Sequence, residues 1–472
     1  MSSFKRSGSL RETAKPTKQA GVLRGKFLWV TIGSCALVFL AAFESVAVTA
    51  VMPAVSAELD GARWYSLAFA GPLATGVIGM VTAGLWADRS GPTVPLYTSV
   101  ALFCAGLVGC GLAPSMEVLV AGRLLQGLGG GAITVALYVV VGRLYPENLQ
   151  PKLFAGFAAV WIFPALVGPA IAGGVIDLFG WEWVFLGVVG LVAVAMLMVV
   201  PALRGSGPQT AQKASAHGFG LLGWATLAAA GVLALNLFGG LPRVGAVISA
   251  VAIAVALVAV RPLLPRGTLV ARGGLPAVIL TRGLVSAAFF GGDVYLPYLL
   301  TERYGFAPAL AGLSLTVGGL TWAGASAVQG RLGERMTHQA GVRIGSALVF
   351  GSLAAVLAAE ALTLPAAAAI AAWGVGGAGM GLMYPRLSTL TLSLSSPAER
   401  GFNSSALAIA DSLGGALALA LGGLLFSAAY GGFTGVFALS AAVGLAAVLI
   451  APRTNAPAEH PASDNRNMEV AA

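Results

Sequence analysis

The chain has 472 residues, of which 57% are hydrophobic and only 10% are charged, and its formal net charge is +9. In an ordinary soluble domain roughly a quarter of the residues are charged, so this composition excludes a water-soluble globular fold. The basic residues are spread between apolar runs and do not cluster with aromatic residues, which argues against a nucleic-acid-binding surface.

Apolar stretches long enough to cross a membrane follow one another along almost the whole chain. A transmembrane helix needs about 20 apolar residues and satisfies its own backbone hydrogen bonds in lipid. The sequence lacks the short alternating segments of a membrane β-barrel. We therefore predict an all-α polytopic membrane protein with fourteen transmembrane helices. The predicted spans are residues 27–53, 65–87, 93–113, 117–141, 153–177, 183–203, 218–240, 244–263, 275–300, 308–330, 342–362, 364–394, 403–427 and 431–451.

The basic residues predict the orientation of these spans. Cytoplasmic loops carry an excess of Lys and Arg. If the N-terminus is cytoplasmic, 21 of the 27 Lys and Arg residues fall on the cytoplasmic side. We therefore expect a multi-pass protein of the cytoplasmic (inner) cell membrane, with polar cytoplasmic tails at 1–26 and 452–472. The exceptions are Arg63, Arg243 and Arg303 outside, and Arg123, Arg282 and Arg386 within spans.

Three acidic residues, Glu44, Asp293 and Asp411, lie inside predicted spans, whereas nearly all others lie in tails or gaps. A carboxylate in low-dielectric surroundings resists ionisation, so a transmembrane proton gradient can load and unload it. We therefore expect these acids to take part in proton coupling, and Glu44 and Asp293 to line a substrate cavity as well. The alternative for each is a protonated or hydrogen-bonded packing residue.

Two of the embedded charges are expected to pair. Arg386 lies about nine residues before the cytoplasmic end of its span, and Asp411 lies about nine residues into the next span from the same side. The two side chains should therefore lie at similar depth. We predict an intramembrane Arg386–Asp411 ion pair, in which Asp411 is mainly a counter-ion.

A short pattern occurs twice in the chain. GLWADRSG at 84–91 and GRLGERM at 330–336 both read Gly, two variable residues, a small residue, an acid and Arg. We expect two six-helix bundles, at 27–203 and 275–451, that each carry this element between their second and third helices. The segment 204–274 is then a linker with two inserted transmembrane helices.

Three further segments carry unusual residues within spans: FESVAVTAVMP at 43–53, RLLQGLGGGA at 123–132 and GPAIAGG at 168–174. An arginine inside the membrane is costly unless it is paired or wet, so Arg123 is expected to have a specific role. Small residues at four-residue spacing, as in GPAIAGG, let two helices approach closely. With GLWADRSG, these segments resemble motifs of the major facilitator superfamily, and specifically of its fourteen-span branch of drug:proton antiporters.

The resemblance implies a major facilitator fold, with two pseudo-symmetric six-helix bundles plus two extra helices. It implies that Arg123 takes part in proton transfer; the alternative is a structural interhelical bond. The acid of the helix 1 motif is Glu44, where this branch has an aspartate. The implied gating motif consists of Gly84, Asp88, Arg89 and Gly91, and the implied antiporter motif consists of Gly168, Pro169, Gly173 and Gly174.

Both implied motifs depart from the family pattern. Pro92 and Thr93 follow the gating motif, where basic residues are usual, and an ordinary turn is the alternative. In and before the implied antiporter motif, Pro164 and Ala172 stand where glycines are usual in the family. The alternative interpretation of this segment is a well-packed helix interface.

These observations lead to the expectation of a proton-coupled secondary transporter that exports small amphiphilic compounds by alternating access, as in multidrug efflux and antibiotic resistance. Its substrates would be lipophilic or cationic, and aromatic rings could stack on them. The alternative for the rings is packing against lipid. The candidate cavity residues are Glu44, Trp161, Phe289, Phe290, Asp293, Tyr295, Tyr298 and Trp322.

Two rival functions remain open: the same fold exporting a lipid or an amino acid, and a non-transporting membrane receptor or scaffold. An enzyme is not expected, because the three histidines lie in gaps or the tail and no GxxxxGK[ST] phosphate loop is present. We expect no cofactor, metal, ATP or nucleic acid, with protons as the coupling ion. The expected partners are a small-molecule substrate and the lipid bilayer, and the chain is expected to act as a monomer.

Overall fold

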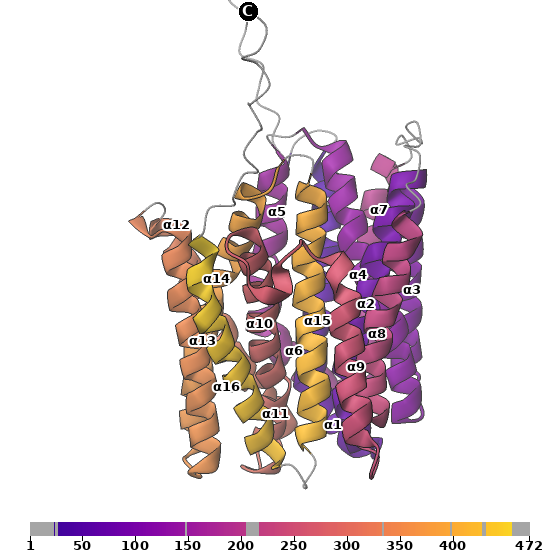
Figure 1. Cartoon of the computed structure of the whole chain (residues 1–472). Helices are drawn as coiled ribbons and strands as arrows, with labels where there is room; N and C mark the ends of the chain where they lie inside the picture. Colours follow the sequence, from indigo (N-terminus) through magenta and orange to yellow (C-terminus); the bar gives the residue numbers. More distant parts are fainter. Residues whose placement is uncertain are drawn as a thin grey trace, which may run out of the picture.

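The computed structural model describes residues 23, 27–146, 149–203, 217–332, 335–396, 399–426 and 431–455. Within these ranges the secondary structure is helical, without a β-strand, which confirms the predicted all-α membrane fold (Figure 1). The predicted tails lie almost entirely outside the described residues. So do Gly333 and Glu334, which belong to the second copy of the repeated pattern.

Twelve helices in the described ranges are long and apolar enough to cross a membrane. The other two predicted spans, 153–177 and 308–330, correspond to the broken helix α5–α6 and to α12. The helices are α1 (Leu28–Glu58), α2 (Tyr65–Ser90), α3 (Thr93–Gly111), α4 (Met116–Leu144), α5 (Gln150–Ala159), α6 (Ile162–Phe179), α7 (Glu182–Leu203), α8 (His217–Phe238), α9 (Gly245–Val260), α10 (Leu275–Asp293), α11 (Tyr295–Glu302), α12 (Pro308–Leu332), α13 (His338–Ala361), α14 (Ala366–Ser393), α15 (Arg400–Phe426) and α16 (Gly432–Ile450).

Two spans that were expected to be continuous helices are interrupted. The span 153–177 breaks between α5 and α6, and the span 275–300 breaks at Val294 between α10 and α11. In each case a proline, Pro164 or Pro297, is the third residue of the helix that follows. Proline lacks the backbone N–H that an interior helical position needs, but it is tolerated in the first turn, so a new helix can begin just before it.

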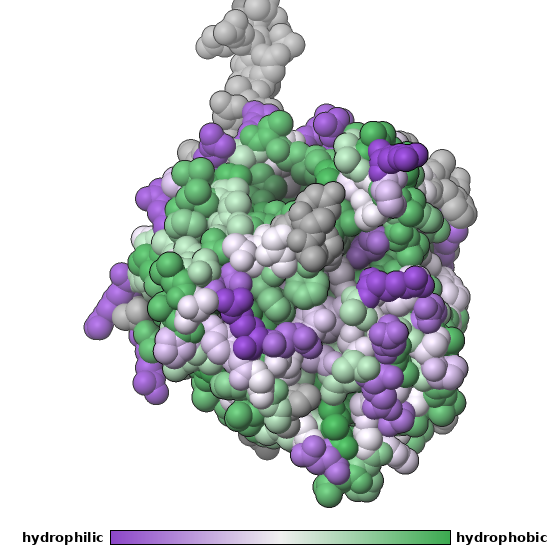
Figure 2. Space-filling model, turned by 90° about the horizontal axis from the view of Figure 1, so that it is seen from below, coloured by the Kyte–Doolittle hydropathy of each residue, from purple (hydrophilic) through white to green (hydrophobic). Residues whose placement is uncertain are grey.

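The helices run between two faces of the molecule. We call the face where α1 begins and α16 ends the tail face, and the opposite face the far face. Contacts between distant segments mark the tail face: the ring of Phe27 stacks on Tyr145 at 4.9 Å, and the Gly274 amide donates to the carbonyl of Arg453 at 3.0 Å. The far face carries the loop between α1 and α2 and the start of α12. Figure 2 shows the molecule from this side. On it, hydrophilic side chains lie among hydrophobic ones.

Close helix packing depends on glycine in α2 and α4. A Cβ atom at Gly127 would lie 2.3 Å from the backbone of Pro72, and one at Gly131 would lie 2.1 Å from the carbonyl oxygen of Gly76. Such distances are far below van der Waals contact, so the two backbones touch because no side chain separates them. The GLGGGA segment of α4 thus fixes how α4 lies against α2.

Helices α1–α7, the N-terminal set, meet helices α10–α16, the C-terminal set, along α2–α15, α1–α12 and α6–α12. Near the far face, Tyr65 Oη donates to the carbonyl oxygen of Val294 at 3.0 Å. Ser66 Oγ lies 2.5 Å from the carbonyl oxygen of Leu419. The rings of Tyr65 and Tyr298 stack with centroids 4.7 Å apart. The two sets are therefore bonded to each other near the far face.

The inserted helix α8 contacts both sets at this point. Asn236 Oδ1 lies 3.0 Å from Ser66 Oγ of α2, so three helices meet at one hydroxyl group. Gly239, which follows α8, packs closely against Leu424 of α15. The insertion is thus packed into the seam between α2 and α15, on both partners.

Candidate functional site

The first polar cluster lies between α1 and α4 of the N-terminal set. Arg123 Nη1 donates to Glu44 Oε1 at 2.5 Å and to Gln126 Oε1 at 2.6 Å. Arg123 Nε donates to the carbonyl oxygen of Ala68 at 3.0 Å. The side chains of Arg123 and Glu44 are only 7% and 5% exposed. Two of the residues proposed for proton coupling, 79 positions apart, are therefore in direct contact.

This cluster is neutral while Glu44 is ionised. A guanidinium stays protonated in proteins, so its burial requires a counter-charge and acceptors for its N–H groups. Glu44 supplies the charge, while Gln126 and Ala68 supply further acceptors. Protonation of Glu44 would leave a buried, uncompensated positive charge on Arg123. Sequence reasoning missed Gln126, although it lies three residues after Arg123 and hence on the same helix face.

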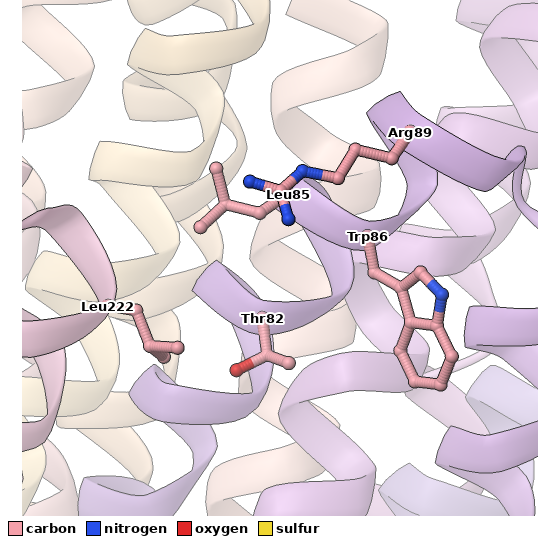
Figure 3. Close-up of a pocket in the computed structure, with 5 residues that line it drawn as sticks. All are labelled: Thr82, Leu85, Trp86, Arg89 and Leu222. Carbon is pink, nitrogen blue, oxygen red and sulfur yellow. The ribbon is translucent and has the colours of Figure 1, made fainter. Parts of the chain in front are cut away.

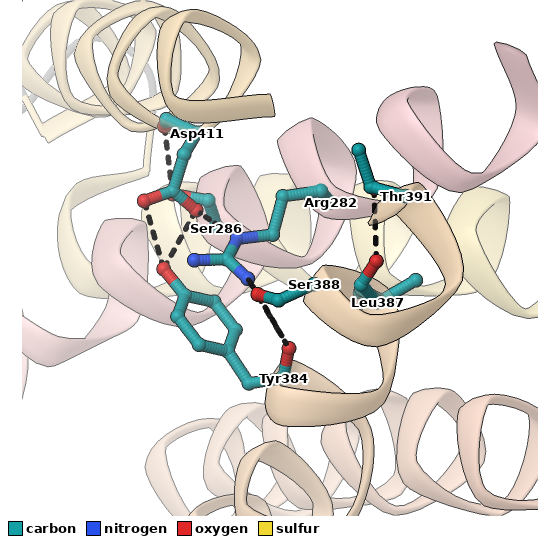
Figure 4. Close-up of polar contacts among 7 residues, drawn as sticks. All are labelled: Arg282, Ser286, Tyr384, Leu387, Ser388, Thr391 and Asp411. Carbon is teal, nitrogen blue, oxygen red and sulfur yellow. Dashed lines mark hydrogen bonds and ion pairs between the residues drawn. The ribbon is translucent and has the colours of Figure 1, made fainter. Parts of the chain in front are cut away.

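The second polar cluster joins α10, α14 and α15 in the C-terminal set (Figure 4). Arg282 Nε donates to Asp411 Oδ1 at 2.7 Å, and Tyr384 Oη donates to the same carboxylate at 2.7 and 2.8 Å. Arg282 Nη1 donates to the carbonyl oxygen of Tyr384 at 3.2 Å and to Ser388 Oγ at 3.3 Å. The prediction that Asp411 pairs with Arg386 is therefore wrong, because its partner is Arg282.

The reason lies in the helical faces of α14. Tyr384 and Ser388 are four residues apart and share the face that meets Arg282. Arg386 is two residues from each, about 200° around the helix, so it points elsewhere. Its Nη1 donates to the carbonyl oxygens of Met336 and Thr337 at 2.8 and 2.9 Å, before the start of α13. Similar depth was a fair expectation, but depth does not determine the face.

Aromatic rings extend from the second cluster. The Arg282 Cζ atom lies 3.2 Å from the centroid of the Tyr384 ring. Trp322 meets Tyr384 edge to face at 5.3 Å and Phe289 at 5.7 Å. Phe289 in turn stacks on Trp373 at 4.5 Å. Of these rings, Trp322 and Tyr384 are partly exposed, whereas Phe289 is 4% exposed and Trp373 is 1% exposed.

The remaining candidates for the cavity wall lie beside this row or apart from it. Phe290 is partly exposed and meets Phe289 edge to face at 5.9 Å. Trp161 is 45% exposed at the break between α5 and α6. Tyr295, in contrast, is buried between Tyr65 and Phe426, so it belongs to the far-face packing.

Asp293 is the last residue of α10, on the far-face side of that helix. It lies within electrostatic reach of the Tyr65 hydroxyl, which is bonded to the next residue, Val294. Its side chain is partly exposed. Tyr298, the second ring expected beside it, stacks on Tyr65 and meets Phe426 at 5.2 Å. Asp293 thus sits beside the contacts that join the two helical sets.

The implied gating motif forms the tail-face end of α2. Gly91 ends the helix with φ of +82°, a conformation that favours glycine. Arg143 Nη2 donates to the carbonyl oxygen of Ala87 at 2.9 Å, which binds the end of α2 to α4. Asp88 and Arg89 are exposed, and Gly84 packs against Val135 of α4.

Arg89 also borders a small hollow between α2 and α8, of about 170 Å³ (Figure 3). The other lining residues are Thr82, Leu85, Trp86 and Leu222. The hollow therefore lies between the N-terminal set and the insertion.

The implied antiporter motif lies in α6, which packs on α1 and on α12 of the other set. A Cβ atom at Gly168 would lie 3.3 Å from Val46 of α1, two residues from Glu44. Pro169 and Gly173 are buried, whereas Gly174 is exposed. The motif thus brings α6 close to the helix that carries the buried acid.

Within the described ranges, no group of three or more His, Cys, Asp or Glu residues is placed to hold a metal ion. The three cysteines, Cys35, Cys104 and Cys110, are free thiols.

Comparison with known proteins gives a consistent result. Residues 34–376 match the family described as the Major Facilitator Superfamily. A probable multidrug-efflux transporter of Mycobacterium tuberculosis is 27% identical over 450 residues, which cover 90% of this chain and 93% of that protein. The multidrug transporter protein MdtP of Bacillus subtilis is 24% identical over 414 residues, which cover 83% of this chain and 74% of that protein.

Solved structures share the fold. A POT family transporter in complex with 5-aminolevulinic acid has a TM-score of 0.66 at 17% identity, covering 89% of this chain and 94% of that one. The xylose transporter XylE of E. coli, in a partially occluded inward open conformation, has a TM-score of 0.63 at 14% identity, covering 92% and 98%. At these identities the likeness concerns the fold alone.

Proposed function

The chain belongs to the Major Facilitator Superfamily and is a membrane transporter, not an enzyme; on that premise we propose that it exports small amphiphilic compounds in exchange for protons. The names of its relatives support the export of more than one compound, because the proteins of M. tuberculosis and B. subtilis described above are named as multidrug transporters. The excess of basic residues in alternate loops supports the orientation with both termini in the cytoplasm.

The observation that carries the proposal is the buried ion pair of Glu44 and Arg123. Deprotonated Glu44 neutralises Arg123, and protonated Glu44 leaves it charged. Since an uncompensated buried charge is costly, the two protonation states favour different arrangements of α1 and α4. Proton binding thereby supplies the differential free energy that a conformational equilibrium needs.

In the proposed cycle, the two helical sets rock about a central cavity and open it to each face in turn. The contacts of Tyr65 and Ser66 correspond to a state closed at the far face, in which substrate enters from the tail face. Export requires these contacts to break. Asp293, beside them, is the second candidate coupling acid, because it is positioned to gain water when the far face opens.

Transport in reconstituted vesicles tests this proposal. An imposed pH gradient should drive a cationic dye across the membrane with wild-type protein, and Glu44→Gln should abolish this accumulation while leaving the protein folded. Glu58→Gln is the matched control, because Glu58 is on the same helix but exposed at the far face. If Glu44→Gln and Asp293→Asn both accumulate dye as well as wild type does, these acids do not couple transport.

A second assay addresses the substrate class. Labelled lipid in the same vesicles separates dye export from lipid export.

A further inference from the structure

The Arg282 side chain occupies a site that is built like a receptor for a flat cation. Its guanidinium has a carboxylate at its edge, with Nε 2.7 Å from Asp411 Oδ1. An aromatic face lies against it, with Cζ 3.2 Å from the Tyr384 centroid. Tyr384 also donates its hydroxyl to Asp411, which fixes the ring and the carboxylate relative to each other. These are the two interactions that proteins use to bind planar, delocalised cations.

The other buried ion pair, Arg123 with Glu44, lacks this combination of a carboxylate and an aromatic face. Arg123 is surrounded by three oxygen acceptors, from Glu44, Gln126 and Ala68. Glu44 is 5% exposed, whereas the Asp411 side chain is 23% exposed. The Asp411 carboxylate is therefore the more accessible of the two carboxylates. Within the described residues, its partner Arg282 lies against an aromatic ring, whereas Arg123, the partner of Glu44, does not.

The surroundings extend the site beyond a single cation. Trp322, which is partly exposed, stands edge-on to Tyr384 at 5.3 Å, so an aryl group attached to a cation has a second ring to pack against. If the Nε atom of Arg282 separates from Asp411, Arg282 still keeps other hydrogen-bond acceptors. Its Nη1 is bonded to the carbonyl oxygen of Tyr384 and to Ser388 Oγ, both on α14.

We propose that Asp411, Tyr384 and Trp322 form a substrate subsite for aryl amidinium or guanidinium compounds, in which the guanidinium of Arg282 is a built-in stand-in that the ligand displaces. This inference rests on the proposed export function, whose substrate class it specifies. Arg282 thereby competes with the cargo. A cation that is flat and delocalised can replace it on the Tyr384 ring, whereas a bulky tetrahedral cation cannot.

Equilibrium binding without any gradient tests the subsite. The full-length protein in lipid nanodiscs is titrated with benzamidine, with its neutral isostere benzamide, and with tetraphenylphosphonium, a cation of the same charge but different shape. Wild type should bind benzamidine and not benzamide. Asp411→Asn should weaken benzamidine binding by about tenfold or more, as expected for loss of a charge-assisted hydrogen bond.

The decisive variant is Arg282→Met, which removes the competitor. It should bind benzamidine about tenfold more tightly than wild type, with a smaller change for tetraphenylphosphonium. Arg386→Met is the matched control: it removes an arginine of α14 that donates to the backbone carbonyls of Met336 and Thr337, and it should leave benzamidine affinity unchanged. If Arg282→Met does not fold, Arg282→Lys takes its place. Lysine keeps the charge but cannot present a planar group to the ring, so benzamidine should again bind more tightly than in wild type.

Weaker benzamidine binding in Arg282→Met and Arg282→Lys would overturn the proposal, because it would make Arg282 a supporting group and not a competitor. An equal gain for tetraphenylphosphonium would overturn it as well, since the site would then select charge and not shape. These outcomes are independent of coupling. If vesicles show no gradient-driven flux but the binding pattern holds, proton-driven export fails and the subsite stands.

Discussion

Tyr65 of α2 donates a 3.0 Å hydrogen bond to the carbonyl oxygen of Val294, the residue between the end of α10 and the start of α11. The donor belongs to the N-terminal set and the acceptor to the C-terminal set, and the Tyr65 ring is almost fully buried. The break in the helix makes this bond possible, because a carbonyl at a helix interruption is available to a partner outside the helix. The bond therefore links the two sets at a point where they must separate if the far face opens.

Tyr65→Phe should shift the protein towards the state open at the far face. It keeps the ring but removes a hydrogen bond worth about 1 kcal/mol, which corresponds to roughly a fivefold change in the equilibrium. Distances between spin labels at positions 112 and 362, exposed near the far face in the two sets, would report the shift. Tyr304→Phe is the control, because Tyr304 donates at 2.9 Å to Leu364 within the C-terminal set. Identical distance distributions in wild type and Tyr65→Phe would show that this bond does not control the opening.

Asp411 should be energetically coupled to Arg282 and not to Arg386. In a double-mutant cycle, Arg282→Met and Asp411→Asn should be non-additive by about 1–3 kcal/mol, since each single change leaves a charge without its partner. The cycle of Arg386→Met with Asp411→Asn should be additive within about 0.5 kcal/mol, because Asp411 accepts from Arg282 whereas Arg386 donates to the carbonyl oxygen of Met336. Reversible unfolding in SDS measures both cycles. A larger coupling for Arg386 than for Arg282 would contradict the arrangement of Figure 4.

Arg123→Lys should destabilise the protein although it conserves the charge. An ammonium group lacks the planar fork that reaches Glu44, Gln126 and Ala68 at once, and the loss should be roughly 1–3 kcal/mol. The same change at Arg63, whose side chain is 76% exposed in its ion pair with Glu117, should stay within about 0.5 kcal/mol. Unfolding free energies of the two variants give the comparison. Equal effects at both positions would mean that the geometry of the buried cluster is unimportant.

Gly131→Ala should impair folding, whereas Gly142→Ala on the same helix should not. A Cβ atom at Gly131 would lie 2.1 Å from the carbonyl oxygen of Gly76, whereas one at Gly142 would have no neighbouring atom within 4 Å among the described residues. Separating α2 from α4 should cost at least about 1–3 kcal/mol, the usual penalty of overpacking. At position 142 the higher helix propensity of alanine should give a neutral or slightly stabilising effect. The monodisperse yield after detergent extraction and the thermal midpoint would distinguish them.

The spans could be predicted from the sequence because their physical requirement is local. A helix in lipid must be apolar over a fixed length, and a polar break must follow it, so α3, predicted at 93–113, is observed at Thr93–Gly111. Pro164 and Pro297, which follow the two helix breaks, can be read from the sequence. Whether a proline bends a helix or begins a new one depends on neighbouring groups that replace the lost backbone hydrogen bond, and these cannot.

The partners of the embedded charges could not be predicted in the same way. Depth follows from counting residues, whereas pairing depends on how each helix is rotated about its axis. Glu44 and Arg123 were both singled out as costly charges, yet nothing local indicates that α1 and α4 turn these residues towards each other. For Asp411, two arginines of suitable depth were available, and only the packing of α10, α14 and α15 selects Arg282.

Helix α8 and the residue after it contact both α2 and α15, because Asn236 lies beside Ser66 and Gly239 packs against Leu424. These partners belong to the two sets that export would pull apart. If the seam opens at the far face as proposed, α8 must therefore break its contacts with one of the two helices and move with the other. On the proposed cycle the inserted pair would be a third moving part, and the strength of its contacts with α2 and with α15 would affect how readily the far face opens.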